Sequence, residues 1–159
     1  MRIVRAMTTD DFENRFKNAE WVLSAEAEAK AVGYRQRAEA ADPSSVPFFQ
    51  IVDLVDDMEP VEGVLEVQQI EVLAHLTALA DEEKGRSGKP FVFDDNVVLS
   101  AELRLRPRQV TRSLERLEAV GLITIMGDRG GRRKRAAEVG HSNCIDLRIL
   151  IARYEELKA

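Results

Sequence analysis

The chain has 159 residues, of which 45% are hydrophobic, 32% charged and only 6% aromatic. This composition is typical of a folded globular protein, and the sequence has no run of about eighteen apolar residues that could span a membrane. The N-terminal residues lack the apolar stretch of a secretory signal, and the single Cys144 cannot form an internal disulfide. We therefore expect a cytoplasmic protein without a membrane partner.

The net charge of −5 argues at first against a nucleic-acid partner, but the charges are unevenly distributed. Residues 1–63 contain seven Lys or Arg and thirteen Asp or Glu, whereas residues 64–159 contain sixteen and fifteen. Residues 104–135 contain ten basic residues and only three acidic ones. Positive charge is thus concentrated in one segment, which is typical of a nucleic-acid-binding surface.

Residues 1–63 are predicted to form an acidic helical extension. A long helix is expected from Asp10 to about Ala41, with a threonine cap at Thr8 or Thr9. Most of its later apolar residues are alanine, which gives a narrow packing face. Three interpretations stay open: a dimerisation contact, packing on its own domain, or a mobile arm.

Two breaks follow this helix. Residues 42–47 have the composition of a linker. Residues 48–58 place apolar side chains at helical spacing, but they are also rich in the β-branched and aromatic residues of a strand, and a short helix is favoured. The second break, Glu59–Gly63, is the predicted boundary with a second domain at residues 64–159.

The second domain begins with a helix predicted over residues 64–83. A short strand is expected at residues 91–93. The next helix is capped by Asp94 or Asp95 and ends near Leu103.

Residues 99–123 have the pattern of a helix-turn-helix. A tight turn at Arg104–Arg106 leads to a second helix from Pro107 to about Val120. This helix has an apolar stripe on one side and a row of arginines on the other: Val110, Leu114 and Leu117 against Arg108, Arg112 and Arg116. An outward row of arginines on the second helix is what reading a DNA groove requires.

The remaining residues predict a β-hairpin with a basic loop. A strand is expected at residues 122–126, and the loop Gly127–Arg135 combines three glycines with five basic residues. Alternating apolar residues from Ile145 to Ile151 predict a returning strand, and residues 154–158 a short final helix.

From residue 64 the predicted order is helix, short strand, helix, turn, helix, strand, basic loop and strand. Residues 99–123 read LxxxLxLxPRQVTRxLxRLExxGLI. With this order and motif the chain resembles the winged helix-turn-helix superfamily, in particular bacterial regulators of the MarR and GntR kinds and phage or plasmid replication proteins. The resemblance implies a mainly α fold with a small β-hairpin, in which a winged helix-turn-helix core follows the helical extension. Arg104 stands where many relatives have a turn glycine, and Arg106 where many have a Ser or Thr cap.

The candidate DNA contacts lie on the second helix and in the basic loop. Gln109 and Arg112 are expected at base edges, because Arg pairs with guanine and Gln with adenine. The other contacts are expected at phosphates or in the minor groove: Arg106, Arg108, Thr111, Arg116, Arg129, Arg132, Arg133, Lys134 and Arg135. Alternatively, Arg108 and Arg112 form a solvated face paired with Glu115, and the loop is a disordered hairpin that helps solubility.

Other patterns do not indicate chemistry. The segment Gly85–Pro90 departs from a phosphate loop at its first glycine and its final Ser or Thr. The side chains of the adjacent aspartates at positions 56–57 and 94–95 are expected to diverge, and neither His75 nor His141 has a nucleophile or carboxylate at a recognisable catalytic spacing. One cysteine and two well-separated histidines argue against a zinc site within one chain. No enzymatic activity, cofactor or metal site is expected.

We expect sequence-specific binding of double-stranded DNA and regulation of transcription by a homodimer. Residues 107–120 would lie in the major groove, residues 127–135 would form the wing, and two symmetric copies would double the base contacts. A first alternative is replication initiation or phage or plasmid maintenance. A second is a winged-helix assembly subunit without DNA, since the acidic N-terminal region could bind a basic protein partner or cover the arginines of its own chain.

Overall fold

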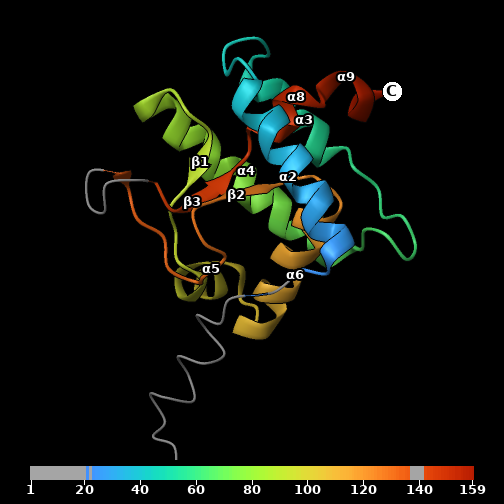
Figure 1. Ribbon diagram of the computed structural model, residues 1–159, viewed down its shortest axis with the longest axis vertical. Helices are drawn as coiled ribbons and strands as arrows, with labels where there is room; N and C mark the ends of the chain where they lie inside the picture. The colour runs from blue at the N-terminus through green and yellow to red at the C-terminus, as the bar shows by residue number, and fades with distance from the viewer. Residues whose placement is uncertain (1–20, 22, 137–141) are drawn as a thin grey trace, which may run out of the picture.

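The computed structural model describes residues 21, 23–136 and 142–159. This part of the chain is mainly helical, with one small three-stranded antiparallel sheet (Figure 1). The helices are α2 (Ala25–Ala40), α3 (Phe48–Asp56), α4 (Val67–Ser87), α5 (Asn96–Leu103), α6 (Pro107–Ala119), α8 (Arg148–Ala152) and α9 (Tyr154–Lys158). The strands are β1 (Phe91–Val92), β2 (Thr124–Met126) and β3 (Cys144–Asp146).

Helix α2 begins later than the sequence predicted. Ser24 is its N-cap, and the Ser24 hydroxyl accepts a hydrogen bond from the Ala27 N–H at 3.1 Å. The prediction of one helix over residues 10–41 is wrong at residues 21, 23 and 24, which are not helical. Its earlier part and its expected threonine cap lie outside the described residues. Trp21 instead packs into the core, where its indole N–H donates to Glu118 at 2.7 Å.

Helices α3 and α4 pack against each other. The structure confirms the short helix favoured after the linker, and it buries the Phe48, Ile51 and Val55 side chains. Helix α4 runs past its predicted end because Gly88 is the residue that takes the left-handed conformation at the C-cap. The Gly88 N–H donates to the Lys84 carbonyl oxygen and closes the helix.

The sheet has the strand order β1-β3-β2, and both strand pairs are antiparallel. Ile145 in the central strand pairs with Val92 on one side and with Ile125 on the other. The short strand predicted before α5 therefore joins the predicted hairpin, so the sheet has three strands and not two.

The predicted returning strand is wrong beyond residue 146. Strand β3 ends at Asp146, whose carboxylate accepts the Arg148 backbone N–H at 2.9 Å and pairs with the Arg148 guanidinium at 2.8 Å. These contacts begin helix α8. The alternating apolar residues of this segment are all buried, but so is Leu150 between two of them. Their pattern therefore reflects burial of the whole segment and not a two-residue period.

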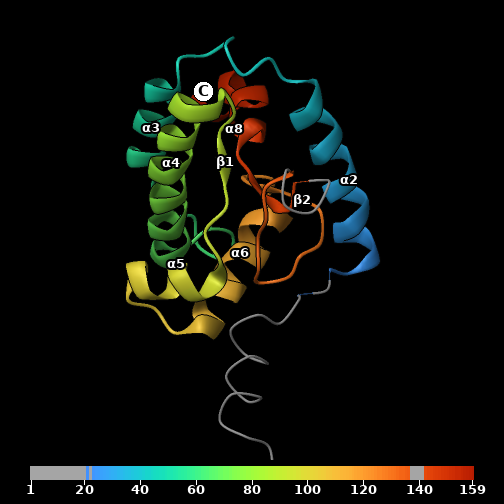
Figure 2. The same ribbon diagram turned by 90° about the vertical axis from the view of Figure 1, so that its left-hand side faces the viewer.

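Helices α5 and α6 lie together at one end of the molecule (Figure 2). The predicted helix, tight turn and second helix are confirmed, with α6 ending within one residue of its predicted end. Arg104 in the turn has φ of 56° and ψ of 40°, and it is the one non-glycine residue with positive φ in the described part of the chain. The left-handed conformation that glycine usually supplies at this turn is thus adopted by an arginine.

One core joins the predicted extension to the predicted second domain. Trp21 and Ile51 belong to the same buried cluster as Leu76 and Leu114. Helix α2 packs against α8, β2 and α6 (Figure 1). The boundary predicted at residues 59–63 therefore lies between elements that share a core. None of the described helices has the length and apolar character that a membrane crossing needs.

Replacing Arg104 by glycine should stabilise the fold by about 1 kcal/mol, because glycine adopts the left-handed conformation without the steric cost of a Cβ atom. Urea unfolding followed by circular dichroism measures the change. Arg106→Gly is the matched control, since Arg106 has φ of −70° and gains nothing from glycine. Equal changes in the two variants would contradict the role assigned to the backbone of Arg104.

Candidate nucleic-acid interface

Helix α6 has a buried side and a charged, exposed side. Its apolar stripe is fully buried, as predicted: Val110, Leu114 and Leu117. The exposed side carries Arg108, Arg112, Glu115 and Arg116. In the described part of the chain none of these four charged side chains takes part in an ion pair, so the alternative pairing of Arg108 or Arg112 with Glu115 is not formed.

Two predicted DNA contacts on α6 make hydrogen bonds within the helix. The Gln109 side-chain oxygen accepts a hydrogen bond from the Arg106 N–H at 2.9 Å, and the Thr111 hydroxyl donates to the Pro107 carbonyl oxygen at 3.1 Å. Gln109 thus helps to cap α6 where the usual Ser or Thr is missing, because the arginine side chain has donors but no acceptor. The Gln109 side chain is therefore held against the start of α6 by this bond.

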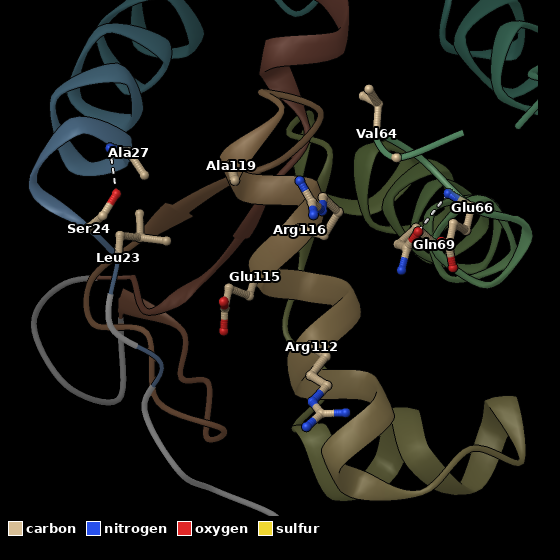
Figure 3. A pocket seen from close by; sticks show the side chains of 11 residues that line it. Leu23, Ser24, Ala27, Val64, Glu66, Gln69, Arg112, Glu115, Arg116 and Ala119 are labelled. Atoms are coloured by element: carbon tan, nitrogen blue, oxygen red, sulfur yellow. Dashed lines mark hydrogen bonds between the residues drawn. The ribbon is translucent and has the colours of Figure 1, made fainter. Parts of the chain in front are cut away.

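A groove of about 620 Å³ runs along the C-terminal half of α6 (Figure 3). One wall is the start of α2 with Leu23, and the other is the segment Gly63–Gln69 that leads into α4. Arg112, Glu115 and Arg116 line the α6 side, and their side chains point in different directions (Figure 3). Only the C-terminal half of α6 is therefore walled, while its N-terminal turn lies outside the groove.

The basic loop after β2 is folded against α5. The Arg133 side chain is buried, and its guanidinium donates to the Asp94 carbonyl oxygen and to Asn96 Oδ1, each at 2.7 Å. The Arg133 backbone N–H donates to Asp95 Oδ1 at 2.7 Å. Asp95 is the N-cap residue of α5, as predicted, but its side chain accepts the hydrogen bond from the loop and makes none to the first turn of the helix. Burial lowers the pKa of Arg133 to about 10.

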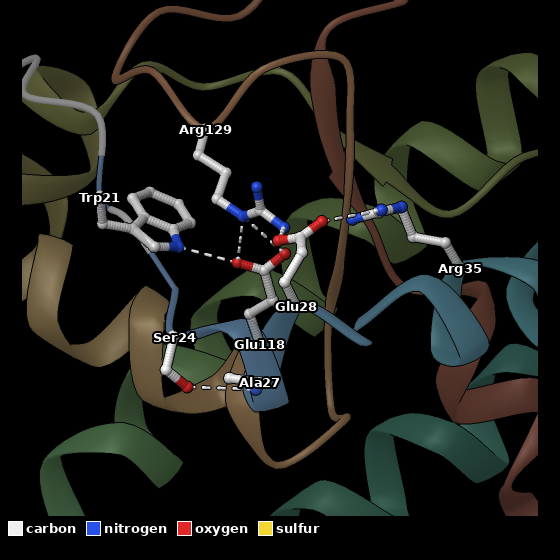
Figure 4. A network of polar contacts seen from close by, with 7 residues as sticks. All are labelled: Trp21, Ser24, Ala27, Glu28, Arg35, Glu118 and Arg129. Carbon is white, nitrogen blue, oxygen red and sulfur yellow. Dashed lines mark hydrogen bonds and ion pairs between the residues drawn. The ribbon is translucent and has the colours of Figure 1, made fainter. Parts of the chain in front are cut away.

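Arg129 belongs to a polar network that joins three parts of the chain (Figure 4). Its guanidinium pairs with Glu118 of α6 at 2.8 Å and with Glu28 of α2 at 2.6 Å. Glu118 is buried and also accepts the indole N–H of Trp21, while Glu28 also pairs with Arg35 at 3.2 Å. The Arg129 side chain is thus used inside the molecule, on the side of α6 that faces the core.

Arg135 makes a third intramolecular contact from the loop. Two of its nitrogens donate to the two Glu83 carboxylate oxygens at 2.7 and 2.8 Å, and its guanidinium lies 4.3 Å from the centre of the Phe93 ring. The hydrogen bonds from Arg135 lower the pKa of Glu83. Arg132 and Lys134 are exposed, and the Lys134 backbone forms a bridge with Asn143.

The structure places one further arginine at this surface, which the sequence does not predict as a DNA contact. Arg104 is exposed in the turn directly before α6. Its position within the most basic segment is a signal for a DNA contact, although its place in the turn by itself predicts only a substitute for glycine. We call the exposed arginines of the turn and of α6 the arginine face: Arg104, Arg106, Arg108, Arg112 and Arg116.

A family model described as the replication protein C N-terminal domain matches residues 25–159. The chain belongs to this family. Comparisons with curated proteins and with solved structures find no match. The matched region of the replication protein C N-terminal domain begins at the first residue of α2 and runs through α9, so it includes the arginine face and the predicted extension from residue 25 onward. Membership favours the replication alternative over the transcriptional regulator expected from the sequence.

The described residues of this replication protein C N-terminal domain contain no group of three His, Cys, Asp or Glu side chains that could hold a metal ion. Gly85 lies within α4 and Gly88 ends that helix, so the segment with a weak likeness to a phosphate loop is a helix end. Cys144 is buried, and burial raises the pKa of its thiol to about 12. His75 lies 3.3 Å from a Glu102 carboxylate oxygen, and His141 lies outside the described residues.

Proposed function

We propose that this domain binds double-stranded DNA in replication initiation, as part of phage or plasmid maintenance. The observation that carries the proposal is the arginine face, whose cations are exposed and make no ion pair in the described part of the chain, on α6 and on the tight turn directly before it. Arginines that no acidic neighbour neutralises are available to phosphates and to guanine bases. Membership in a family of replication proteins supports the choice of replication as the task.

The order of the elements supports a winged-helix arrangement. Helix α4, β1, α5, α6, β2 and β3 follow one another, with β3 between the other two strands. In this arrangement α6 enters the major groove and the loop between β2 and β3 flanks it as the wing. Since Arg129, Arg133 and Arg135 bind acidic or carbonyl groups of their own chain, we assign the phosphate contact of the wing to Arg132, with Lys134 beside it.

On the arginine face, Arg108 and Arg112 are the proposed readers of guanine. A guanidinium can donate two hydrogen bonds to guanine O6 and N7, which no other base offers in the major groove. Arg104, Arg106 and Arg116 are assigned to phosphates, which fix the position of α6 along the duplex. Gln109 supports the start of α6 through its bond to Arg106 and is not assigned a base in this proposal.

A titration of the protein with short duplexes over a salt series tests DNA binding. Affinity should fall steeply between about 50 and 200 mM salt, because each phosphate contact releases counterions. A single strand of the same sequence should bind less tightly. No duplex binding even at the lowest salt would reject the proposal and favour a protein-interaction subunit.

Selection of bound sequences from random duplexes tests the target and the symmetry. A palindromic site would support a homodimer, because two-fold protein symmetry is mirrored in the DNA. Placing the selected site on a DNA circle that lacks its own origin then separates the two tasks. Replication that depends on the protein supports the proposal, whereas altered expression of a neighbouring gene without replication supports the transcriptional regulator.

The adjacent residues Arg132 and Arg133 should behave oppositely when each is replaced by methionine. Arg132→Met should weaken binding to all duplexes alike and reduce the salt slope by about 1, with unchanged stability. Arg133→Met should leave the salt slope unchanged and destabilise the fold by about 2 to 3 kcal/mol, because the Asp94 and Asn96 oxygens lose their donor. Urea unfolding and fluorescence anisotropy measure the two effects. A reduced salt slope in folded Arg133→Met would contradict its internal role.

A further inference from the structure

Glu115 is an acidic side chain among the arginines of α6. It is exposed, it follows Arg112 by one turn of the helix and it directly precedes Arg116. In the described part of the chain its carboxylate makes no ion pair. In the groove along α6 the Glu115 side chain points toward the wall formed by Leu23, and the two arginine side chains point elsewhere (Figure 3).

An unpaired carboxylate weakens a surface that binds phosphates, because its charge has the same sign as the DNA backbone. Its chemistry does fit one base edge. A carboxylate only accepts hydrogen bonds, and in the major groove cytosine presents a 4-amino donor without an acceptor of its own. Guanine and the thymine carbonyl present acceptors, which repel a carboxylate, and adenine places an acceptor beside its donor.

We infer that Glu115 is a specificity-determining residue that accepts a hydrogen bond from the 4-amino group of a cytosine. This inference rests on the proposed function, since it requires α6 to lie in the major groove. Residues three apart on a helix are separated by about 4.5 Å along its axis, which lies between the rise of one base pair, about 3.4 Å, and that of two. The cytosine read by Glu115 therefore lies within one or two base pairs of the base read by Arg112.

Two substitutions of Glu115 separate base reading from charge repulsion. Glu115→Ala removes both the charge and the acceptor, whereas Glu115→Gln keeps the shape and can pair with adenine through its amide. Glu82→Gln is the matched control, because Glu82 is an exposed glutamate in the C-terminal part of α4 and does not line the groove along α6. Each protein is used as the full chain in a selection from random duplexes, and anisotropy competition with single-base variants of the selected site follows.

The expected wild-type preference for cytosine at one position is about tenfold. Glu115→Ala should lose this preference, with tighter binding confined to duplexes that lack the cytosine, because the cytosine duplex also loses its hydrogen bond. Glu115→Gln should shift the preference at that position to adenine. Glu82→Gln should match the wild type. An unchanged base preference in both Glu115 variants, with uniformly tighter binding, would overturn the inference while leaving the proposed function intact. Absence of wild-type binding to any duplex would reject both.

Discussion

Replacing Arg108, Arg112 and Arg116 together by alanine should lower the affinity for duplex DNA by about a hundredfold or more at about 100 mM salt. The three side chains are exposed and unpaired in the described structure, so their loss leaves no internal acid without its partner. The change therefore acts on binding and leaves the core intact. Anisotropy with the selected site measures the affinity, and circular dichroism with urea unfolding confirms the fold.

A triple variant elsewhere on the surface controls for the loss of net charge. Lys30, Arg86 and Lys158 are exposed cations on α2, α4 and α9. Lys30 and Lys158 each pair with an exposed glutamate of their own helix, and Arg86 lies 3.8 Å from the buried Glu83, whose two closer hydrogen bonds come from Arg135. Replacing all three by alanine removes the same charge but none of the arginine face. This variant should bind duplex DNA within a few-fold of the wild type, through the weak long-range effect of charge. Equal losses in the two triple variants would show that net charge, and not the surface of α6, governs binding.

Gly121→Ala should destabilise the fold by about 3 kcal/mol or more. Gly121 follows the C-terminal end of α6 with φ of 73°, and a Cβ atom there would overlap the ring of Tyr34 from α2. The site cannot relax easily, because the Gly121 carbonyl oxygen accepts a hydrogen bond from Arg153 at 2.6 Å and the Arg153 guanidinium lies 5.2 Å from the centre of the Tyr34 ring. The expected cost combines left-handed backbone strain with overpacking. Urea unfolding measures it.

Gly88→Ala isolates the backbone part of this cost. Gly88 has φ of 85°, but a Cβ atom at Gly88 would meet no other atom within 4 Å. Its substitution should destabilise the fold by only about 1 kcal/mol. If Gly121→Ala costs no more than Gly88→Ala, overpacking against the Tyr34 ring does not contribute to the cost.

Helices α3, α5 and α6 were predictable because their signals are local. Val110, Leu114 and Leu117 mark the buried side of α6 without knowledge of any other segment. The start of α2 and the end of β3 were not predictable in this way. Helix α2 begins only after Ser24, and the preceding Trp21 is hydrogen-bonded to Glu118, which lies almost a hundred residues later in the sequence. Strand β3 ends at Asp146, which pairs with Arg148, and the alternation of apolar residues in this segment does not predict that pairing.

The candidate interface was predictable on α6 and less so in the loop. Arg108, Arg112 and Arg116 are exposed because helical spacing alone places them opposite the buried stripe. A loop has no such period, so the sequence could not distinguish Arg132, which is exposed, from Arg133, which is buried beside Asn96. The acidic partners Glu28, Glu83 and Glu118 come from distant elements, and only the tertiary fold brings them to the loop.

Glu118 of α6 accepts a hydrogen bond from Trp21 and pairs with Arg129 of the loop after β2 (Figure 4). Arg129 also pairs with Glu28 near the start of α2, so α6 is linked to both segments. These contacts fix the orientation of α6 in the free protein. A recognition element that is already ordered loses little conformational entropy when it meets its target, so more of the contact energy remains as affinity. We therefore expect DNA association with a small change in heat capacity, set by the contact area, and not the large change of a segment that folds on binding.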